Sequence, residues 1–334
     1  MAKEHILKFL ADHLGSRIAL VGHLRPDGDA FGSCIGLASI LRTAGYRPKV
    51  VNPSPLPPHL SFLVDESLIL HNPDVNWWRD FDCLGVLDCG ETGRLEEINR
   101  EAAAHLPTFT IDHHVTSAGI GEASWIEAEA SSTGELVVRL CQAAKWTLPE
   151  QAAMALWTAI VSDTSRFSYE NTSADALAAA RECVLAGADP TLAARAMFQS
   201  VSVAERKLQT RVLERMELHE GGRLGLSWIR WEDFEAAGTT VEGAPDLINL
   251  IRDTSGVEVA IFLYEPPTTP TGKQMVKISL RAQPPHDALA IALRFNGGGH
   301  NRAAGASAEA GIPKVREQVL ELARQSFFSG DASS

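Results

Sequence analysis

Hydrophobic and polar positions follow one pattern before about residue 165 and another after residue 223. In the first part, short apolar runs alternate with longer segments whose apolar positions recur at helical spacing. Buried strands separated by helices are typical of a parallel sheet that is covered on both faces. The first part is therefore predicted to be an α/β domain with a mostly parallel sheet. Its strands are expected at residues 17–22, 48–51, 81–88 and 108–112.

The second part combines apolar or alternating strands with a few helices. Between the two parts, residues 173–218 have the composition of successive helices. Further strands are expected at 224–229, 257–264 and 275–280, and helices at 245–252, 287–295 and 313–326. The chain is thus predicted to contain an N-terminal catalytic domain (1–190), a helical linker (191–220) and a smaller mixed α+β domain (221–330).

Three predicted strands of the first part are followed by acidic or histidine side chains. The carboxyl ends of parallel strands meet at one edge of a sheet, where open α/β sheets bind their ligands. A further acidic residue ends the helix predicted from about residue 149, where the helix macrodipole disfavours an anion and a bound cation would compensate for it. These side chains are His23, Asp27 and Asp29 after the first strand, Asp88 at the end of the third, Asp112, His113 and His114 at the end of the fourth, and Asp163 at the helix end.

Six of these side chains, four carboxylates and two imidazoles, are expected to bind metal. This number exceeds what one metal ion needs, and it predicts a two-metal site. Asp88, at the end of a central strand, is the natural bridge between the ions. A ligand set rich in carboxylates with two imidazoles favours manganese over zinc or calcium, and two such ions suit phosphoryl chemistry. An alternative is that the acidic residues of the first loop only cap the following helix. The six expected ligands are His23, Asp27, Asp29, Asp88, His113 and Asp163.

A second candidate for phosphate binding lies near the end of the chain. The glycines around Gly298 expose backbone N–H groups and permit close approach of a phosphate, although a tight turn is the alternative interpretation. Arg281 ends a predicted strand, and a guanidinium can bind phosphate through two hydrogen bonds. We therefore expect Arg281, Gly298, Gly299 and His300 to contact substrate.

Composition and charge exclude several other classes of protein. The 334 residues are 45% hydrophobic and 22% charged, as in ordinary globular proteins, and no apolar run is as long as a membrane span. The formal net charge of −12 argues against a protein that coats long nucleic acid. The five cysteines are scattered, and the N-terminus is typical of an amphipathic helix rather than a signal peptide. A reducing, cytoplasmic location is therefore expected.

Five segments, in order along nearly the whole chain, resemble the motifs of the DHH phosphoesterase superfamily and of its DHH-associated second domain. The domain order and length are similar to those of the NrnA-type enzymes, which degrade very short RNAs and dephosphorylate 3′-phosphoadenosine 5′-phosphate. The five segments are His23 to Ser33 (HLRPDGDAFGS), Leu87-Asp88, Asp112-His113-His114, Ser162-Asp163-Thr164 and Gly297 to Gly305 (GGGHNRAAG).

This resemblance divides the metal ligands into two sets. One manganese ion would be held by His23 and Asp27, and Asp88 would bridge it to a second ion. The second ion would be held by Asp29, His113 and Asp163. Magnesium or cobalt are possible substitutes for manganese.

The resemblance also implies roles for residues that do not bind metal. His114 would contact the scissile phosphate or the leaving oxygen, and Asp112 would orient an imidazole. Arg281 and the segment Gly298–His300 would bind substrate. The chain departs from the family pattern at two places: Ser165 stands where glycine is common, and Arg25 where a smaller polar residue is common.

The expected function is manganese-dependent hydrolysis of phosphoester bonds. The expected substrates are short RNA or DNA oligonucleotides, dinucleotides or 3′-phosphoadenosine 5′-phosphate, rather than long nucleic acid, and a homodimer is possible. One alternative is a phosphodiesterase for cyclic or linear dinucleotides, such as cyclic di-AMP or pApA. Another is a non-catalytic nucleotide sensor on the same scaffold. A family II pyrophosphatase lacks the glycine–histidine signature, and a RecJ-type exonuclease needs an additional nucleic-acid-binding domain.

Overall fold

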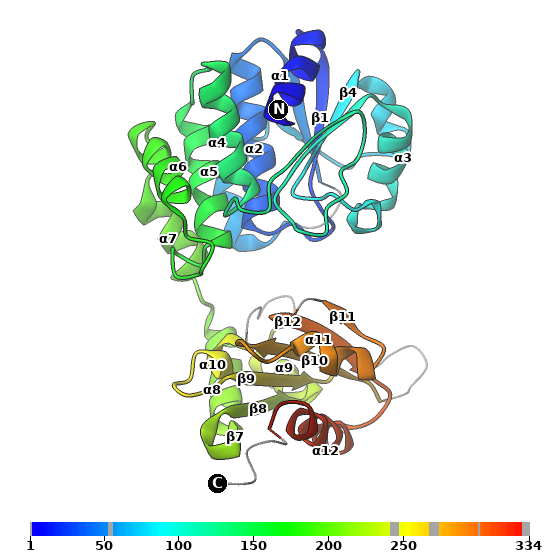
Figure 1. Cartoon of the computed structure of the whole chain (residues 1–334), viewed down its shortest axis with the longest axis vertical. Helices are drawn as coiled ribbons and strands as arrows, with labels where there is room; N and C mark the ends of the chain where they lie inside the picture. The colour runs from blue at the N-terminus through cyan, green and yellow to red at the C-terminus, as the bar shows by residue number, and fades with distance from the viewer. Residues whose placement is uncertain (1, 53–55, 241–246, 267–273, 300, 329–334) are drawn as a thin grey trace. The chain divides into compact units, whose positions relative to one another are not determined.

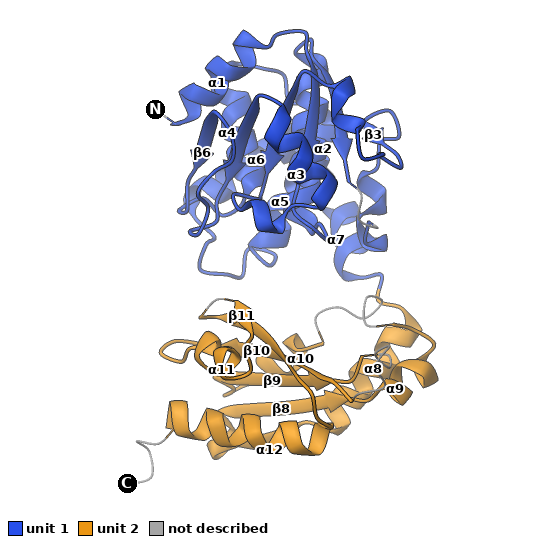
Figure 2. Cartoon of the chain, turned by 90° about the vertical axis from the view of Figure 1, so that its right-hand side faces the viewer, with its two compact units in different colours: residues 1–200 blue, residues 201–334 orange. Residues whose placement is uncertain are grey.

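The computed structural model describes residues 2–52, 56–240, 247–266, 274–299 and 301–328. The chain forms two compact units, Met1–Ser200 and Val201–Ser334, which Figure 2 shows in separate colours. The boundary between them falls within the segment that the sequence predicted as a linker. Within the described residues, every helix is too short or too polar to cross a membrane.

The first unit is built on a six-stranded sheet whose neighbouring strands are all parallel (Figure 1). The strand order is β3-β2-β1-β4-β5-β6. The three strands that precede the predicted site residues are therefore neighbours, with β4 between β1 and β5. The strands are β1 (Arg17–Val21), β2 (Arg47–Val51), β3 (Ile69–Leu70), β4 (Cys83–Leu87), β5 (Thr108–Asp112) and β6 (Ala123–Ile126).

Both faces of this sheet are covered, which explains the continuous apolar runs of its strands. Ile18 and Leu20 of β1 pack in the larger core, to which α1, α2, α4, α5 and α6 contribute. Ala19 and Val21 face the opposite way and pack on the side of α3. The helices are α1 (Ala2–Asp12), α2 (Gly28–Thr43), α3 (Glu97–His105), α4 (Thr133–Ala144), α5 (Glu150–Asp163), α6 (Ala174–Leu185) and α7 (Pro190–Phe198), with 3-10 turns at Pro58–Leu63, Trp77–Asp80 and Thr92–Arg94.

Close packing between α2 and α5 brings the end of α5 to the sheet edge. Gly32 of α2 makes this possible, because a Cβ at this position would lie 2.5 Å from the carbonyl oxygen of Ala155 in α5. Likewise, a Cβ at Gly28 would lie 2.6 Å from the hydroxyl of Ser162. The start of α2 and the residue before Asp163 are therefore in contact.

The second unit contains a mixed sheet with the order β11-β12-β10-β9-β8-β7, in which β8 and β9 pair in parallel and the other neighbours are antiparallel. Helices α11 and α12 pack on one face, and α8, α9 and α10 pack on the other. The elements are α8 (Val203–Glu214), β7 (Glu217–His219), β8 (Leu224–Ile229), α9 (Trp231–Ala237), α10 (Asn249–Arg252), β9 (Val259–Tyr264), β10 (Val276–Ala282), α11 (Ala288–Arg294), β11 (Gly298–Gly299), β12 (Ala303–Ala308) and α12 (Ile312–Ala323). A 3-10 turn at Glu220–Gly222 connects β7 and β8, and a π-helical turn at Arg324–Phe328 follows α12.

Part of the glycine-rich segment near the C-terminus forms a strand rather than a tight turn. Gly298 and Gly299 form strand β11, which pairs with Gly305 and Ala304 of β12. The two strands approach closely, since a Cβ at Gly299 would lie 2.6 Å from the carbonyl oxygen of Ala303. β12 escaped prediction because alanine and glycine give no clear hydrophobic alternation. The predicted site residue His300 lies outside the described residues.

Candidate metal centre

The loop after β1 presents the first candidate ligands. Asp27 is the N-cap of α2, and its Oδ1 accepts hydrogen bonds from the N–H groups of Asp29 and Ala30 at 3.1 and 3.0 Å. Its Oδ2 lies 3.7 Å from His23 Nε2. His23 Nδ1 lies 2.9 Å from the Leu24 carbonyl oxygen, which fixes the ring with Nε2 toward the carboxylates. The cap interpretation therefore holds for one oxygen of Asp27, while the other faces the site.

Asp88 lies between two imidazoles at the end of β4. Its Oδ2 is 3.5 Å from His23 Nε2, and its Oδ1 is 3.5 Å from His113 Nε2. The side chain is only 2% exposed, and Thr133 Oγ1 donates a hydrogen bond to Oδ1 at 3.2 Å. The backbone of Asp88 is left-handed, with φ 57°, a strained conformation that functional sites often hold. Asp88 thus connects the loop after β1 with the end of β5.

Asp29 is fully buried and reaches from α2 to the N-terminus of α4. Its Oδ2 accepts a hydrogen bond from the Thr133 N–H at 2.7 Å, and its Oδ1 accepts from the Gly134 N–H and the Ser33 hydroxyl, each at 2.9 Å. The N-terminus of a helix stabilises an anion. The same Oδ2 lies 3.6 Å from His113 Nε2, so the carboxylate is fixed with one oxygen at the site.

Carboxylate oxygens converge on His113 Nε2. Asp163 Oδ2 lies 3.1 Å from this nitrogen, and Asp88 and Asp29 lie at 3.5 and 3.6 Å. His113 Nδ1 faces the Ala130 carbonyl oxygen at 3.3 Å. Asn171 Nδ2 donates to the Asp163 carbonyl oxygen at 3.1 Å and holds the end of α5 in place.

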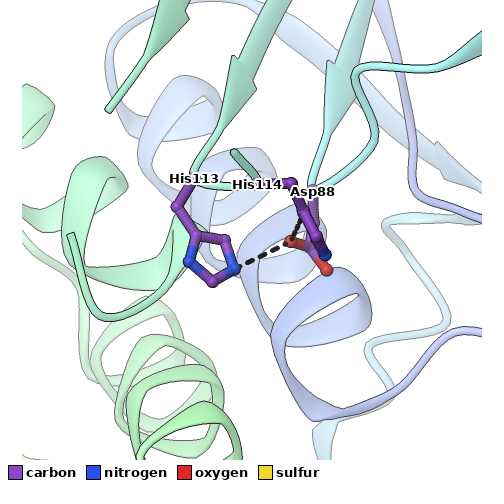
Figure 3. A group of neighbouring side chains, drawn as sticks. All are labelled: Asp88, His113 and His114. Atoms are coloured by element: carbon purple, nitrogen blue, oxygen red, sulfur yellow. Dashed lines mark ion pairs between the residues drawn. The ribbon is translucent and has the colours of Figure 1, made fainter. Parts of the chain in front are cut away.

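The half-buried His114 and the buried Asp112 form a pair beside Asp88. Asp112 Oδ1 contacts His114 Nδ1 at 2.8 Å and accepts the backbone N–H groups of His113 and His114 at 2.8 and 3.2 Å. His114 Nδ1 also lies 3.5 Å from Asp88 Oδ1. Figure 3 shows the rings of His113 and His114 both approaching Asp88. The carboxylate of Asp112 thus fixes the orientation of the His114 ring.

The packing of these charges shifts their pKa values. Burial acts to lower the pKa of His23, but Asp27 and Asp88 outweigh it and raise that pKa to about 10. Burial likewise acts to lower the pKa of His113, whereas Asp163 and Asp88 raise it to about 12. Burial raises the pKa of Asp163 to about 6. In the absence of a metal ion, protons on the imidazoles therefore balance the carboxylates.

Burial is also the largest influence on the pKa of Asp29, which it raises, with the neighbouring charge of Asp88 acting in the same direction. For Asp88, burial acts upward as well, but the hydrogen bonds to His113 and His23 outweigh it and lower the pKa. Closely spaced carboxylates of this kind favour a cation among them.

The donor set fits a metal ion. The buried His113 Nε2 has no well-formed hydrogen bond, although three carboxylate oxygens surround it. The Nδ1 atoms of His23 and His113 face carbonyl oxygens, which is the usual arrangement when Nε2 is the metal ligand. Three groups of side chains each bring candidate ligand atoms within 4.8 Å of one another: His23, Asp27 and Asp88; Asp29, His113 and Asp163; and Asp88, His113 and His114.

The predicted substrate residues belong to the second unit. Arg281 lies near the end of β10, where it is half-buried and its Nη1 donates to the Leu280 carbonyl oxygen at 3.0 Å. Gly298 is exposed, and a Cβ there would meet nothing within 4 Å. A hollow of about 580 Å³ next to β10 is lined by Lys277, Ser279 and Asn296, among others.

Sequence reasoning missed the part that the N-terminus of α4 plays in the site. Ser132 is the N-cap of α4, and its hydroxyl accepts a hydrogen bond from the Glu135 N–H. Nothing in the sequence connects Thr133 and Gly134 with Asp29, which lies 104 residues earlier than Thr133. Only the tertiary packing of α4 against α2 brings them together.

The family comparison agrees with the fold. The model of the DHH family N-terminal domain matches residues 17–160, and the model of the DHHA1 domain matches residues 233–327. The chain belongs to the DHH family, and it is a phosphoric ester hydrolase.

Two relatives and one solved structure are similar over most of the chain. The bifunctional oligoribonuclease and PAP phosphatase NrnA of Thermus thermophilus is 30% identical over 313 residues, which are 92% of this chain and 89% of that protein. The protein of the same name from Bacillus subtilis is 28% identical over 293 residues, 87% of this chain and 88% of that one. The crystal structure of an exopolyphosphatase-related protein from Bacteroides fragilis superposes with a TM-score of 0.88 at 25% identity and covers 97% of both chains.

Proposed function

We propose that this protein hydrolyses phosphoester bonds of short oligonucleotides, dinucleotides or 3′-phosphoadenosine 5′-phosphate, with two manganese ions at the candidate metal centre. The observation that carries the proposal is the position of Asp88. Its two oxygens face different imidazoles, His23 on one side and His113 on the other, at 3.5 Å each. A carboxylate shared in this way is suited to bridge two ions.

In this proposal His23 and Asp27 hold one ion, and Asp29, His113 and Asp163 hold the other. The set is rich in oxygen ligands with two imidazole nitrogens, which suits manganese. Two ions so held would lower the pKa of a water molecule and would stabilise the negative charge of the phosphoryl oxygens.

The chain's own residues would then orient the reacting groups. Asp112 fixes His114 through its Nδ1, so that the opposite ring nitrogen, Nε2, would meet the scissile phosphate or the leaving oxygen. Hydrogen bonds from Thr133 and Gly134 hold Asp29 rigidly, which keeps the ligand geometry constant during the reaction. In the second unit, Arg281 and the exposed backbone of Gly298 and Gly299 would bind substrate phosphate, with His300 beside them in the sequence.

The preference for short substrates has two supports. The similar proteins of Thermus thermophilus and Bacillus subtilis are named as oligoribonucleases and PAP phosphatases. In addition, a net charge of −12 is unsuited to a long track of phosphate contacts.

A substrate panel with manganese tests the proposal. Dinucleotides, RNA of increasing length, a cyclic dinucleotide, 3′-phosphoadenosine 5′-phosphate and pyrophosphate are compared by kcat/KM. We expect the highest values for the dinucleotides or 3′-phosphoadenosine 5′-phosphate and a steep decline with RNA length. Equal rates on a long strand and a dinucleotide would contradict the proposed substrate class. Tight nucleotide binding without turnover would identify a sensor instead, and a preference for the cyclic substrate would identify a cyclic dinucleotide phosphodiesterase.

A further inference from the structure

Backbone strain in the first unit gathers around the candidate metal centre. Among the residues that the structure describes, nine that are not glycine have φ in the left-handed region. Five of these nine lie close in sequence to a candidate ligand or are one. They are Arg25, Asp88, Ser165, Arg166 and, four residues after Asp163, Phe167. Because left-handed backbone is costly for these residue types, so dense a group calls for a local reason.

Helix capping explains one of the three consecutive residues after α5. Ser165 N–H donates to the Ser162 carbonyl oxygen at 3.1 Å, and Arg166 N–H donates to the Val161 carbonyl oxygen at 2.9 Å. This pair of bonds is the Schellman motif, which requires a left-handed residue at the position of Ser165. The motif makes no such demand on Arg166 and Phe167, whose φ values are 63° and 61°.

Side-chain contacts hold this additional left-handed turn. The Thr164 hydroxyl accepts the Phe167 N–H at 3.1 Å and donates to the Ile160 carbonyl oxygen at 2.6 Å. The Phe167 ring packs edge-on against Trp157, with centroids 5.8 Å apart. The Thr164 hydroxyl and the Trp157 ring therefore hold the turn in place. The turn in turn sets the direction in which the Arg166 side chain leaves the backbone.

Arg166 is exposed, and its guanidinium carbon lies 4.9 Å above the ring of Phe198, the last residue of α7. Stacking occupies the face of a guanidinium and leaves its N–H donors pointing outward in the plane. A planar, oriented fork of this kind matches the geometry of phosphate oxygens.

Arg25, in the loop after β1, has a comparable backbone conformation. It lies between the candidate ligands His23 and Asp27, it is exposed, and its φ is 56°. The conformation is doubly unfavourable here, because Pro26 follows, and residues before proline prefer extended backbone. A second arginine is thus held on strained backbone within two residues of candidate metal ligands.

The two arginine-bearing turns belong to one edge of the first unit. Gly28, next to Asp27, lies against Ser162, next to Asp163, and a Cβ at Gly28 would also come within 3.2 Å of Met197 Cε. Met197 directly precedes Phe198, on which Arg166 stacks. Contacts between α2, α5 and α7 therefore connect both turns.

The charges expected at the site indicate a role for these two arginines. The four candidate ligand carboxylates, Asp27, Asp29, Asp88 and Asp163, carry four negative charges when ionised, which two divalent ions only neutralise. A phosphate that enters this site brings further negative charge, so additional cations are needed to bind it.

We propose that Arg25 and Arg166 form a phosphate clamp on the first unit, which binds the non-bridging oxygens of the scissile phosphate group. The inference rests on the proposed function and adds two positioning residues to it. It differs from the role proposed for Arg281, because the clamp would act on every substrate, including those without a terminal phosphate.

The test compares variants on two substrates with manganese, a 5′-phosphorylated dinucleotide and bis(p-nitrophenyl) phosphate. Arg166→Ala and Arg25→Ala are each expected to lower kcat/KM about 10- to 100-fold on both substrates, the effect of losing one hydrogen bond to a charged group. Arg166→Lys should recover part of the loss. Arg181→Ala, at an exposed arginine of α6 that pairs with Glu182, is the matched control and should leave both rates unchanged. Unchanged rates in both clamp variants would overturn the inference.

Arg166→Gly separates the guanidinium from the backbone. Glycine accepts the left-handed conformation without strain, so the turn should persist even if the alanine variant folds poorly. The clamp predicts that this variant is as impaired as Arg166→Ala. Near-normal rates would show that only the turn matters and would refute the clamp.

A binding measurement distinguishes failure of the clamp from failure of the proposed function. Calorimetry with inorganic phosphate on the manganese-loaded protein should show binding about 10- to 100-fold weaker in Arg166→Ala, with unchanged manganese content. Equal phosphate affinity in wild type and variant would refute the clamp, whether or not either protein hydrolyses nucleotides. A wild type that binds phosphate through Arg166 but hydrolyses neither substrate would refute the proposed function alone.

Discussion

The carboxyl ends of β1, β4 and β5 and the C-terminal strands β10–β12 are both rich in residues that suit phosphate chemistry, but they are built differently. At the strand ends of the first unit, each candidate ligand is fixed by a neighbour, as Asp29 is by the N-terminus of α4. In the second unit, Arg281 makes a hydrogen bond to the adjacent carbonyl, and Gly298 is open to solvent.

This difference indicates that the two regions suit different tasks. A rigid arrangement of buried carboxylates and imidazoles suits ions whose positions must not change during the reaction. An open polar surface instead suits contacts that depend on the size and charge of the substrate. Changes in the first region should therefore affect all substrates, whereas changes in the second should affect some more than others.

The largest effect is expected from Asp88→Asn. Asparagine tolerates left-handed backbone and keeps an oxygen for the Thr133 hydroxyl, so the fold should persist. Loss of the bridging charge should lower kcat/KM by about 1,000-fold or more on every substrate, with less manganese bound. Steady-state kinetics and metal analysis measure both. Full manganese occupancy with near-normal turnover would refute the two-metal proposal.

Arg281→Ala is expected to act selectively. If Arg281 anchors a terminal phosphate, its loss should cost about 2–4 kcal/mol of transition-state stabilisation on substrates that carry such a phosphate. Manganese content should not change, and a small aryl phosphodiester should be hydrolysed almost as fast as by wild type. The measurement is kcat/KM for both substrates in both proteins. An equal loss on the two substrates would show that Arg281 does not serve as an anchor.

Some of the features behind these two predictions could be predicted from the sequence, and others could not. The strand ends were predictable, because apolar runs followed by Asp or His in an α/β pattern must place those side chains at one sheet edge. The position of Asp88 between His23 and His113 also follows from β4 lying between β1 and β5.

Other features needed the tertiary structure. The contact of the α4 N-terminus with Asp29 joins segments far apart in the chain, which no local pattern encodes. In the second unit, β11 and β12 consist mainly of glycine and alanine, so that hydrophobic alternation could not reveal them. The sequence therefore predicted which side chains gather at the sheet edge better than it predicted the contacts that hold them there.

Gly134→Ala tests the rigid support of the metal centre. A Cβ at this position would lie 2.5 Å from the Ala159 Cβ of α5, so α4 and α5 must separate slightly. Overpacking of this kind costs about 1–3 kcal/mol of stability. The shift should also loosen the hydrogen bond from the Gly134 N–H to Asp29 and weaken manganese binding.

Denaturant unfolding and metal titration measure the two effects of Gly134→Ala. A matched control is Gly93→Ala, at a glycine of the first unit where a Cβ would meet nothing within 4 Å. If Gly134→Ala destabilises the fold but leaves manganese affinity intact, the support of Asp29 by α4 is not needed for metal binding.

The smallest effect is expected at a carboxylate of the first unit that needs no metal. Asp65 accepts hydrogen bonds from Arg42 at 3.1 Å and from the Ser67 N–H at 2.8 Å. Burial acts to raise its pKa, but hydrogen bonds, those from Ser67 first, outweigh burial and lower the pKa to about 2. Because the folded pKa lies below the unfolded one, the ionised form stabilises the fold above about pH 4, and this contribution disappears as the pH falls toward 2.

Asp65→Asn should therefore cost about 1 kcal/mol at pH 7, with the difference from wild type shrinking below about pH 4. Urea unfolding at several pH values measures the difference. A chelator should leave it unchanged, because Arg42 and Ser67 already stabilise this charge, whereas the carboxylates around His113 are proposed to bind metal ions. A difference that grows toward low pH, or that changes on metal removal, would contradict this contrast between the two kinds of carboxylate.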